Sequence, residues 1–187
     1  MDQSRLRLRW APQPQMNLAN FDVLRVDRAH DATLAPLLQQ YCCEMRTWIA
    51  PMSGAEDFTY PPEKIWNDDT DVYLARAADI PAGFALVGSA QRYIGDPQVR
   101  DMVEFFVAAQ FRRNGFGRAM AGYIWNQYRS DWLIRVHQGN TPAMRFWARA
   151  IAHYSSGAYR EDVRSISGNA WSYFRFAPSN SRVRTRP

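Results

Sequence analysis

The sequence predicts a three-layer α/β (α+β) domain in which helices flank a central, mostly antiparallel sheet. Strand-like and helical segments follow one another in the order βα, hairpin and strand, α, β, α, ββ, which is typical of such a mixed architecture. The 187 residues are 47% hydrophobic and 14% aromatic, enough to bury one core without disulfide bonds or a structural metal. We expect one domain over 21–177, between a flexible extension at 1–20 and a basic tail at 178–187.

The first half of the chain contains a helix between strands. We expect a strand at 21–26, a helix at 31–49, and two further strands at 72–77 and 83–93. Asp31 stands where a helix N-cap is favoured, and the turn "ADIPA" joins the last two strands as a hairpin. The turn-rich segment 50–71, with one short helix near 63–66, is long for a plain connection, as functional loops often are.

The second half alternates strands with helices before a final strand pair. The expected strands are 102–109, 132–136, 158–166 and 170–176, and the expected helices are 117–128 and 141–151. Pro142 suits the first turn of the second helix. One parallel connection in the middle of the sheet follows from this order.

The segment "FRRNGFGRAM" at 111–120 lies between a predicted strand and a predicted helix. Backbone N–H groups at a helix start bind phosphate, and Gly115 and Gly117 let the backbone approach a ligand closely. The dinucleotide fingerprint is excluded because Met120 replaces its third small residue. The P-loop is excluded because Gly117 is followed by Arg118 and Ala119, with neither lysine nor hydroxyl. The alternative is a glycine-bearing turn with exposed arginines.

A second motif, "NTPAMRFW", begins 25 residues after Gly115, where the next strand ends. Together, R-x-x-G-x-G at 112–117 and N-x-x-A-x-x-F-W at 140–147 resemble the GNAT superfamily of N-acetyltransferases, over most of the chain from Phe21 to Phe176. Within it, the sequence is similar to a bacterial branch of predicted acetyltransferases of unknown substrate. The resemblance implies a GNAT fold, acetyl-CoA as cosubstrate and no metal.

The resemblance also implies a set of cofactor-binding residues. The strand backbone would pair with the pantetheine arm, the loop would hold the pyrophosphate, and residues of the second motif would line the acyl-CoA channel. In that order these residues are Phe105, Phe106 and Val107; Arg112, Arg113, Asn114, Gly115, Phe116, Gly117 and Arg118; Asn140, Phe146 and Trp147.

Amide formation needs a base that removes a proton from the ammonium group of the acceptor. Glu104 is the first candidate, because a carboxylate on an otherwise apolar strand is costly unless it is used or paired. Asp101, a water molecule or His137 are the alternatives. Many relatives carry a tyrosine as general acid where Trp147 stands, and an indole N–H is no useful acid. Solvent or another tyrosine (Tyr154, Tyr159 or Tyr173) would then protonate the leaving thiolate.

The expected acceptor is a primary amine of a small molecule or peptide, attacked directly in a ternary complex. The segment 52–71 is rich in acidic and aromatic residues, including Glu56 and Asp57. Such a segment suits a cationic amine, or it is a solvated acidic loop. No apolar run is long enough to span a membrane and no nucleic-acid motif accompanies the net charge of +5, so we expect a cytoplasmic enzyme. A homodimer stays open, as does a non-catalytic acyl-CoA-binding module.

Overall fold

The computed structural model describes residues 21–53 and 58–178; the predicted extension at 1–20, most of the tail, and Glu56 and Asp57 lie outside these residues. One seven-stranded sheet runs in the order β1-β2-β3-β4-β5-β7-β6. Its strands are β1 (Phe21–Val26), β2 (Asp71–Ala77), β3 (Ile80–Ser89), β4 (Arg100–Val107), β5 (Trp132–His137), β6 (Tyr159–Ile166) and β7 (Asn169–Phe176). All neighbours are antiparallel except β4 and β5, so the predicted fold class is confirmed.

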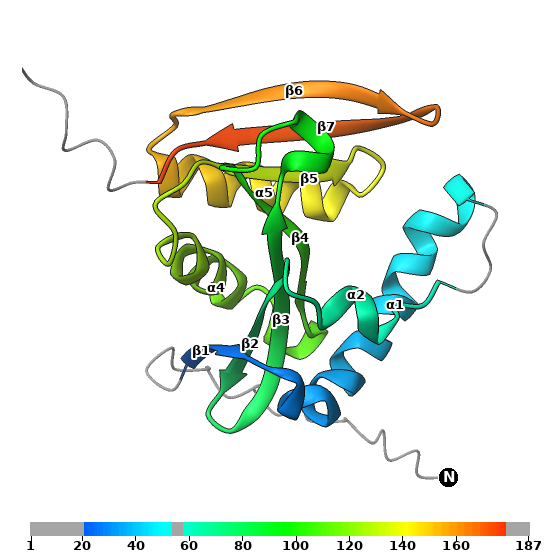
Figure 1. The fold of residues 1–187 in the computed structure, drawn as a ribbon, viewed down its shortest axis with the longest axis vertical. Coiled ribbons are helices and arrows are strands. Elements are labelled where there is room, and N and C mark those ends of the chain that lie inside the picture. Colours follow the sequence, from blue (N-terminus) through cyan, green and yellow to red (C-terminus); the bar gives the residue numbers. More distant parts are fainter. Residues whose placement is uncertain (1–20, 54–57, 179–187) are drawn as a thin grey trace, which may run out of the picture.

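Helices cover both sides of this sheet. They are α1 (Asp31–Ser53), α2 (Pro62–Ile65), α3 (Gln91–Ile94), α4 (Phe116–Trp125) and α5 (Thr141–Ser155), with short 3₁₀ turns η2 (Arg28–His30) and η3 (Ala109–Phe111). Figure 1 shows α1 and α2 on one side of β3 and β4, and α4 on the other. The three predicted layers are therefore present.

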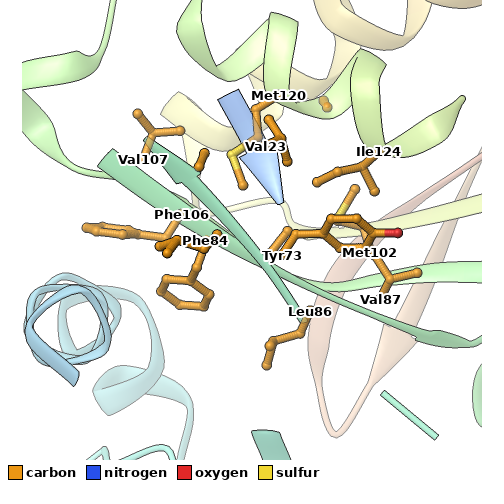
Figure 2. Packing of buried hydrophobic residues seen from close by; sticks show 14 of the residues in the cluster. Val23, Tyr73, Phe84, Leu86, Val87, Met102, Phe106, Val107, Met120 and Ile124 are labelled. Atoms are coloured by element: carbon orange, nitrogen blue, oxygen red, sulfur yellow. The ribbon is translucent and has the colours of Figure 1, made fainter. Parts of the chain in front are cut away.

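The core fills both interfaces between sheet and helices. Figure 2 shows Val23, Met120 and Ile124 on the α4 side of the sheet, and Phe84 and Phe106 on the α1 side. All five are at most 4% exposed. Successive strand residues point to opposite faces, so each central strand contributes side chains to both interfaces. Its sequence is therefore largely apolar instead of alternating.

The parallel pair β4 and β5 separates soon after it begins. Backbone pairing between them covers only Arg100 with Trp132 and Asp101 with Leu133. Beyond these residues β4 continues to pair with β3, and β5 with β7. The backbones of the two strands therefore diverge in a wedge beyond Asp101, and one side of β4 has no strand partner there among the described residues.

Three local predictions are wrong. Asp31 does not cap α1 from outside; it is the first helical residue, and its carboxylate accepts a hydrogen bond from Trp66 Nε1 at 2.8 Å, while Asp27 caps the preceding η2 turn. The helix α1 continues to Ser53, past the predicted end at 49. The strand predicted over 83–93 ends at 89, because the Ser89 hydroxyl accepts from the backbone N–H of Gln91 and starts α3.

Candidate active site

Glu104 lies on β4 just beyond the point at which β4 and β5 separate. Its side chain is half-buried and its carboxylate accepts a hydrogen bond from the hydroxyl of Tyr41 on α1. Tyr41 is buried, with its ring packed edge-on against Phe84 and Phe106 at centroid distances of 5.6 and 5.9 Å. The core therefore fixes the residue that holds this carboxylate.

The surroundings of Glu104 prepare it to accept a proton near neutral pH. Burial raises the pKa of Glu104 from its ordinary 4.5 to about 7, while the hydrogen bond from Tyr41 and the charge of Arg135 act in the opposite direction. A general base works best when its pKa lies near the operating pH. Burial and the nearby charge of Glu104 raise the pKa of Tyr41 well above its usual range, so Tyr41 remains a neutral donor.

Asp101, the alternative base, is fully buried and paired. The Arg135 guanidinium donates to its two oxygens at 2.8 to 3.3 Å and stacks on the ring of Tyr93, 3.4 Å from the centroid. Burial raises the pKa of Asp101 while Arg135 lowers it. Because Asp101 is on β4 and Arg135 on β5, this ion pair joins the two strands next to the last backbone pair before they separate.

The glycine loop ends in a helix start that lacks any side-chain cap. Gly115 is the N-cap of α4 and has a left-handed backbone conformation (φ 81°). Arg113, two residues earlier, is also left-handed (φ 68°). The first N–H groups of a helix have no intrahelical acceptor, and Gly115 offers no side chain to satisfy those of Phe116 and its neighbours. Together with the helix dipole, these donors form a site suited to an anion.

Arg112 stabilises the loop instead of projecting freely from it. Its Nε donates to the Val107 carbonyl at 2.6 Å, and its Nη2 donates to both carboxylate oxygens of Glu44 on α1 at 2.9 and 2.8 Å. Arg113, Asn114 and Arg118 are exposed. Arg112 is exposed as well, but its guanidinium is already paired with a carboxylate, so the loop's other solvent-facing cationic groups are those of Arg113 and Arg118.

Three of the predicted cofactor-binding residues, one from the pantetheine-pairing strand and two from the predicted channel, meet beside the wedge between β4 and β5. The rings of Phe105 and Phe146 stack at 5.7 Å, and Trp147 packs edge-on against both at 4.9 and 4.8 Å. Gly117 brings α4 against this cluster, since a Cβ there would lie 3.1 Å from the Phe146 ring. The side chain of Phe106 points to the opposite face and joins the core under α1, which leaves only its backbone for the predicted pairing with pantetheine.

A surface depression of about 380 Å³ continues from the loop between α4 and α5. Gly115 and Arg118 line its loop end; Trp125, His153 and Tyr154 line its far end. The indole Nε1 of Trp125 is buried without a hydrogen-bond partner among the described residues. A buried donor of this kind costs free energy unless something accepts from it. The depression itself has the space for part of a ligand beside the loop.

The remaining candidates make local contacts. Asn140 caps α5, its Oδ1 accepting from the Ala143 N–H at 3.2 Å. His137 packs on Trp171 at 5.3 Å, and its buried Nδ1 has no partner within the part of the chain that the structure describes.

Each tyrosine considered as a general acid has a neighbour of its own. The Tyr154 hydroxyl donates to Asn126 at 2.9 Å, Tyr159 packs on Phe174, and Tyr173 lies under the guanidinium of Arg164.

Two side chains of α1 were missed as site residues by the sequence analysis. Tyr41 lies within the helix predicted over 31–49 and was given no role of its own, and Glu44, on the next turn, was not considered. A hydroxyl at the centre of an otherwise apolar stripe is the signal for Tyr41, since a buried hydroxyl needs a partner. No sequence pattern pairs Glu44 with Arg112, because the two are 68 residues apart.

Comparison with protein families decides the identity of the fold. The family model whose description is Acetyltransferase (GNAT) family matches residues 40–151. This match covers more than half of the chain, from α1 through the glycine loop to α5. The chain belongs to the GNAT acetyltransferase family. It is therefore an N-acetyltransferase of EC class 2.3.1, as the two motifs predict. No curated protein matches the chain.

Solved structures of GNAT acetyltransferases share the fold. Arabidopsis thaliana NAA60 in complex with a bisubstrate analogue is 15% identical (TM-score 0.54, 84% of this chain and 97% of that one). The putative acetyltransferase yncA from Salmonella typhimurium, with its cofactor acetyl-CoA, is 11% identical (0.54, 84% and 94%). The ribosomal-protein-S18-alanine N-acetyltransferase from Escherichia coli is 13% identical (0.57, 85% and 94%). The predicted GNAT-like architecture is thus confirmed.

The described residues offer neither a metal site nor a membrane span. Within 21–53 and 58–178, no cluster of His, Cys, Asp or Glu side chains has the composition of a metal site. None of the described helices combines the length and hydropathy needed to cross a bilayer.

Proposed function

We propose that this GNAT enzyme transfers the acetyl group of acetyl-CoA to a primary amine by direct attack in a ternary complex, with Glu104 as general base. The carrying observation is the position of Glu104: beside the opening between β4 and β5, hydrogen-bonded to Tyr41, with its pKa raised to about 7. A carboxyl group with this pKa is both ionised often enough to accept a proton and basic enough to hold it.

Acetyl-CoA is the cosubstrate and supplies a reactive thioester. The N-terminus of α4, with its uncapped N–H groups, would hold the pyrophosphate, and Arg113 and Arg118 would add positive charge. The depression between α4 and α5 would receive the nucleotide end, and the cluster of Phe105, Phe146 and Trp147 would exclude water from the acyl end.

Glu104 then accepts a proton from the ammonium group of the acceptor, directly or through one water molecule. The neutral amine attacks the thioester carbonyl and the C–N bond forms. The nitrogen gives up its second proton to solvent, and the C–S bond breaks with both electrons leaving on sulfur. Trp147 is buried among aromatic rings and cannot protonate the thiolate. The proton that the thiolate takes up therefore comes from solvent. Asp101, held by Arg135, keeps the two strands at the correct separation and is not the base in this scheme.

The acceptor would enter from the α1 side. Tyr41, which donates to Glu104, packs with Phe58 and Tyr60 in an aromatic cluster, with centroid distances of 6.1 to 6.5 Å between the rings. Burial, and after it the charge of Glu104, raises the pKa of Tyr60, which places the two groups within electrostatic reach of each other. Aromatic faces beside a carboxylate favour a cationic amine.

The test is turnover of an amine panel with acetyl-CoA by wild type and Glu104→Gln. We expect the variant to lose about 10²- to 10⁴-fold in kcat while its affinity for CoA in calorimetry stays unchanged. The matched control is Asp79→Asn, which also replaces a carboxylate with an amide but at the exposed β2–β3 turn. Failure of the wild type to bind CoA would overturn the whole proposal; an unchanged kcat in Glu104→Gln would overturn the base assignment alone.

A further inference from the structure

The sequence contains a single lysine, and the fold places it on the same side of the sheet as the proposed base. Lys64 lies in α2, which covers the same side of β3 and β4 as α1 does (Figure 1). Its side chain is exposed, and its ammonium group has no carboxylate partner among the residues that the structure describes. A primary amine of this kind is the functional group that the proposed reaction acetylates.

Contacts with the core fix the backbone of α2 next to α1. Ile65, the residue after Lys64, is 2% exposed and belongs to the same hydrophobic cluster as Tyr41. Trp66 Nε1 donates to the Asp31 carboxylate at the start of α1, 2.8 Å away. The backbone of Lys64 is therefore held in place, while its side chain, a flexible four-carbon stem, is free to turn.

The segment that precedes α2 leads to Glu104 through two aromatic rings. Tyr60 packs on the ring of Tyr41 with 6.4 Å between the centroids, and Tyr41 donates to Glu104. The charges of Arg135 and Lys64 both lower the pKa of Glu104, which places the ammonium group within electrostatic reach of this carboxylate. Arg135 is already ion-paired, and a guanidinium does not lose a proton in proteins. Of these two cations, only Lys64 can become a neutral nucleophile.

We propose that the enzyme acetylates its own Lys64 in an intramolecular reaction, an inference that rests on the proposed function. The Lys64 ammonium gives one proton to Glu104, directly or through one water molecule, and the neutral Nζ attacks the thioester carbonyl of acetyl-CoA. The C–N bond forms, the nitrogen gives up its second proton to solvent, and the C–S bond breaks with both electrons leaving on sulfur. The thiolate takes up a proton from solvent, so the products are an Nε-acetylated Lys64 and free CoA.

The test is incubation of the full chain with acetyl-CoA, without any added amine, followed by measurement of the intact mass over time. We expect one acetyl group per molecule, and tandem mass spectrometry of the fragments should locate it on Lys64 and not on the N-terminal amine. Because base and acceptor belong to one molecule, the rate constant should not depend on protein concentration. Glu104→Gln should lower it about 10²- to 10⁴-fold without loss of CoA affinity in calorimetry.

The matched control moves the lysine to another exposed position. Lys64→Arg combined with Arg129→Lys keeps the number of lysines, but position 129 follows α4, the helix on the opposite side of the sheet from α2 (Figure 1). We expect no acetylation at position 129 beyond the slow uncatalysed reaction, whose rate is measured with wild type unfolded in guanidinium chloride. Thermal melting checks that the double variant folds.

The outcomes separate this inference from the function on which it rests. Acetylation of position 129 as fast as that of Lys64, an unchanged rate in Glu104→Gln, or a rate constant that rises with protein concentration would each overturn the inference. An unmodified Lys64 in an enzyme that acetylates amines of the panel would also overturn it, and would leave the proposed function standing. Failure of the wild type to bind CoA would overturn both.

Discussion

The hydrogen bond from Tyr41 to Glu104 predicts a specific change in the pH dependence of the enzyme. In Tyr41→Phe the ring and its contacts with Phe84 and Phe106 remain, and only the hydroxyl is lost. That hydroxyl lowers the pKa of Glu104 against the effect of burial. Without the hydroxyl, the ionised carboxylate of Glu104 loses more hydrogen-bond stabilisation than the protonated form does, so the pKa of Glu104 rises.

The size of this effect follows from the energy of the bond. A hydrogen bond to a charged group contributes about 1.5 to 3 kcal/mol, which corresponds to a rise of about one to two pH units. A base with a pKa of about 7 is half ionised at pH 7. If its pKa rises to about 8.5, about 3% is ionised at pH 7, and the rate falls about 15-fold.

The assay is kcat/KM for acetyl transfer between about pH 6 and pH 10, a range that brackets both pKa values. We expect the rate of Tyr41→Phe to fall at neutral pH and to approach that of wild type above about pH 9, because the base is then ionised in both. Tyr73→Phe removes a hydroxyl from a separate network, with Tyr128, and is the matched control. A uniform loss at every pH would refute the role of Tyr41 in setting the pKa, and an unchanged profile would refute the role of Glu104 as base.

Three further predictions concern binding and stability. In Glu104→Gln the free energy of unfolding should exceed that of wild type by about 3 kcal/mol at pH 8, because the folded-state pKa of Glu104, about 7, lies above the ordinary 4.5. Urea denaturation should show this gain growing between about pH 4.5 and pH 7 and vanishing at about pH 4. Gly117→Val should weaken CoA binding in calorimetry and destabilise the protein by about 1–3 kcal/mol, since its first carbon alone would lie 3.1 Å from the Phe146 ring; unchanged affinity would argue against close approach of CoA to α4. Asp101→Asn should lower the free energy of unfolding by about 3–5 kcal/mol, because it leaves the Arg135 charge without its partner; full stability with lost turnover would instead favour Asp101 as the base.

The sequence predicted the elements whose signals are local. The strands at 21–26 and 132–136 followed from their apolar patterns, and α5 from its spacing and from Pro142 near its start. Helix starts were harder to predict. Asp27 and Asp31 are both aspartates, a residue type favoured at N-caps, and the 3₁₀ turn between them has no distinct sequence signal. Boundaries between strand and short helix depend on single hydrogen bonds that a pattern does not contain.

The candidate site was predictable to the same extent and for the same reason. The glycine loop and Glu104 stand out within short stretches of sequence, as a motif and as a charge on an apolar strand. The pairing of Glu104 with Tyr41, and of Asp101 with Arg135, joins segments 63 and 34 residues apart. Side chains so distant in sequence acquire partners only through the fold, so a single sequence identifies the reactive groups but not what holds them.

The helix α1 connects the two halves of the proposed reaction. Tyr41 and Glu44 lie one turn apart on it; the first binds the carboxylate of Glu104, and the second binds Arg112 at the start of the glycine loop. Arg112 also binds the carbonyl of Val107, the last residue of β4. A shift of α1 would therefore act both on the base, in the second half of β4, and on the phosphate loop that follows the end of β4. Because Glu44 already neutralises Arg112, the positive charge available to phosphate comes from Arg113 and Arg118. Arg112 contributes by holding the loop at a fixed position relative to Glu104.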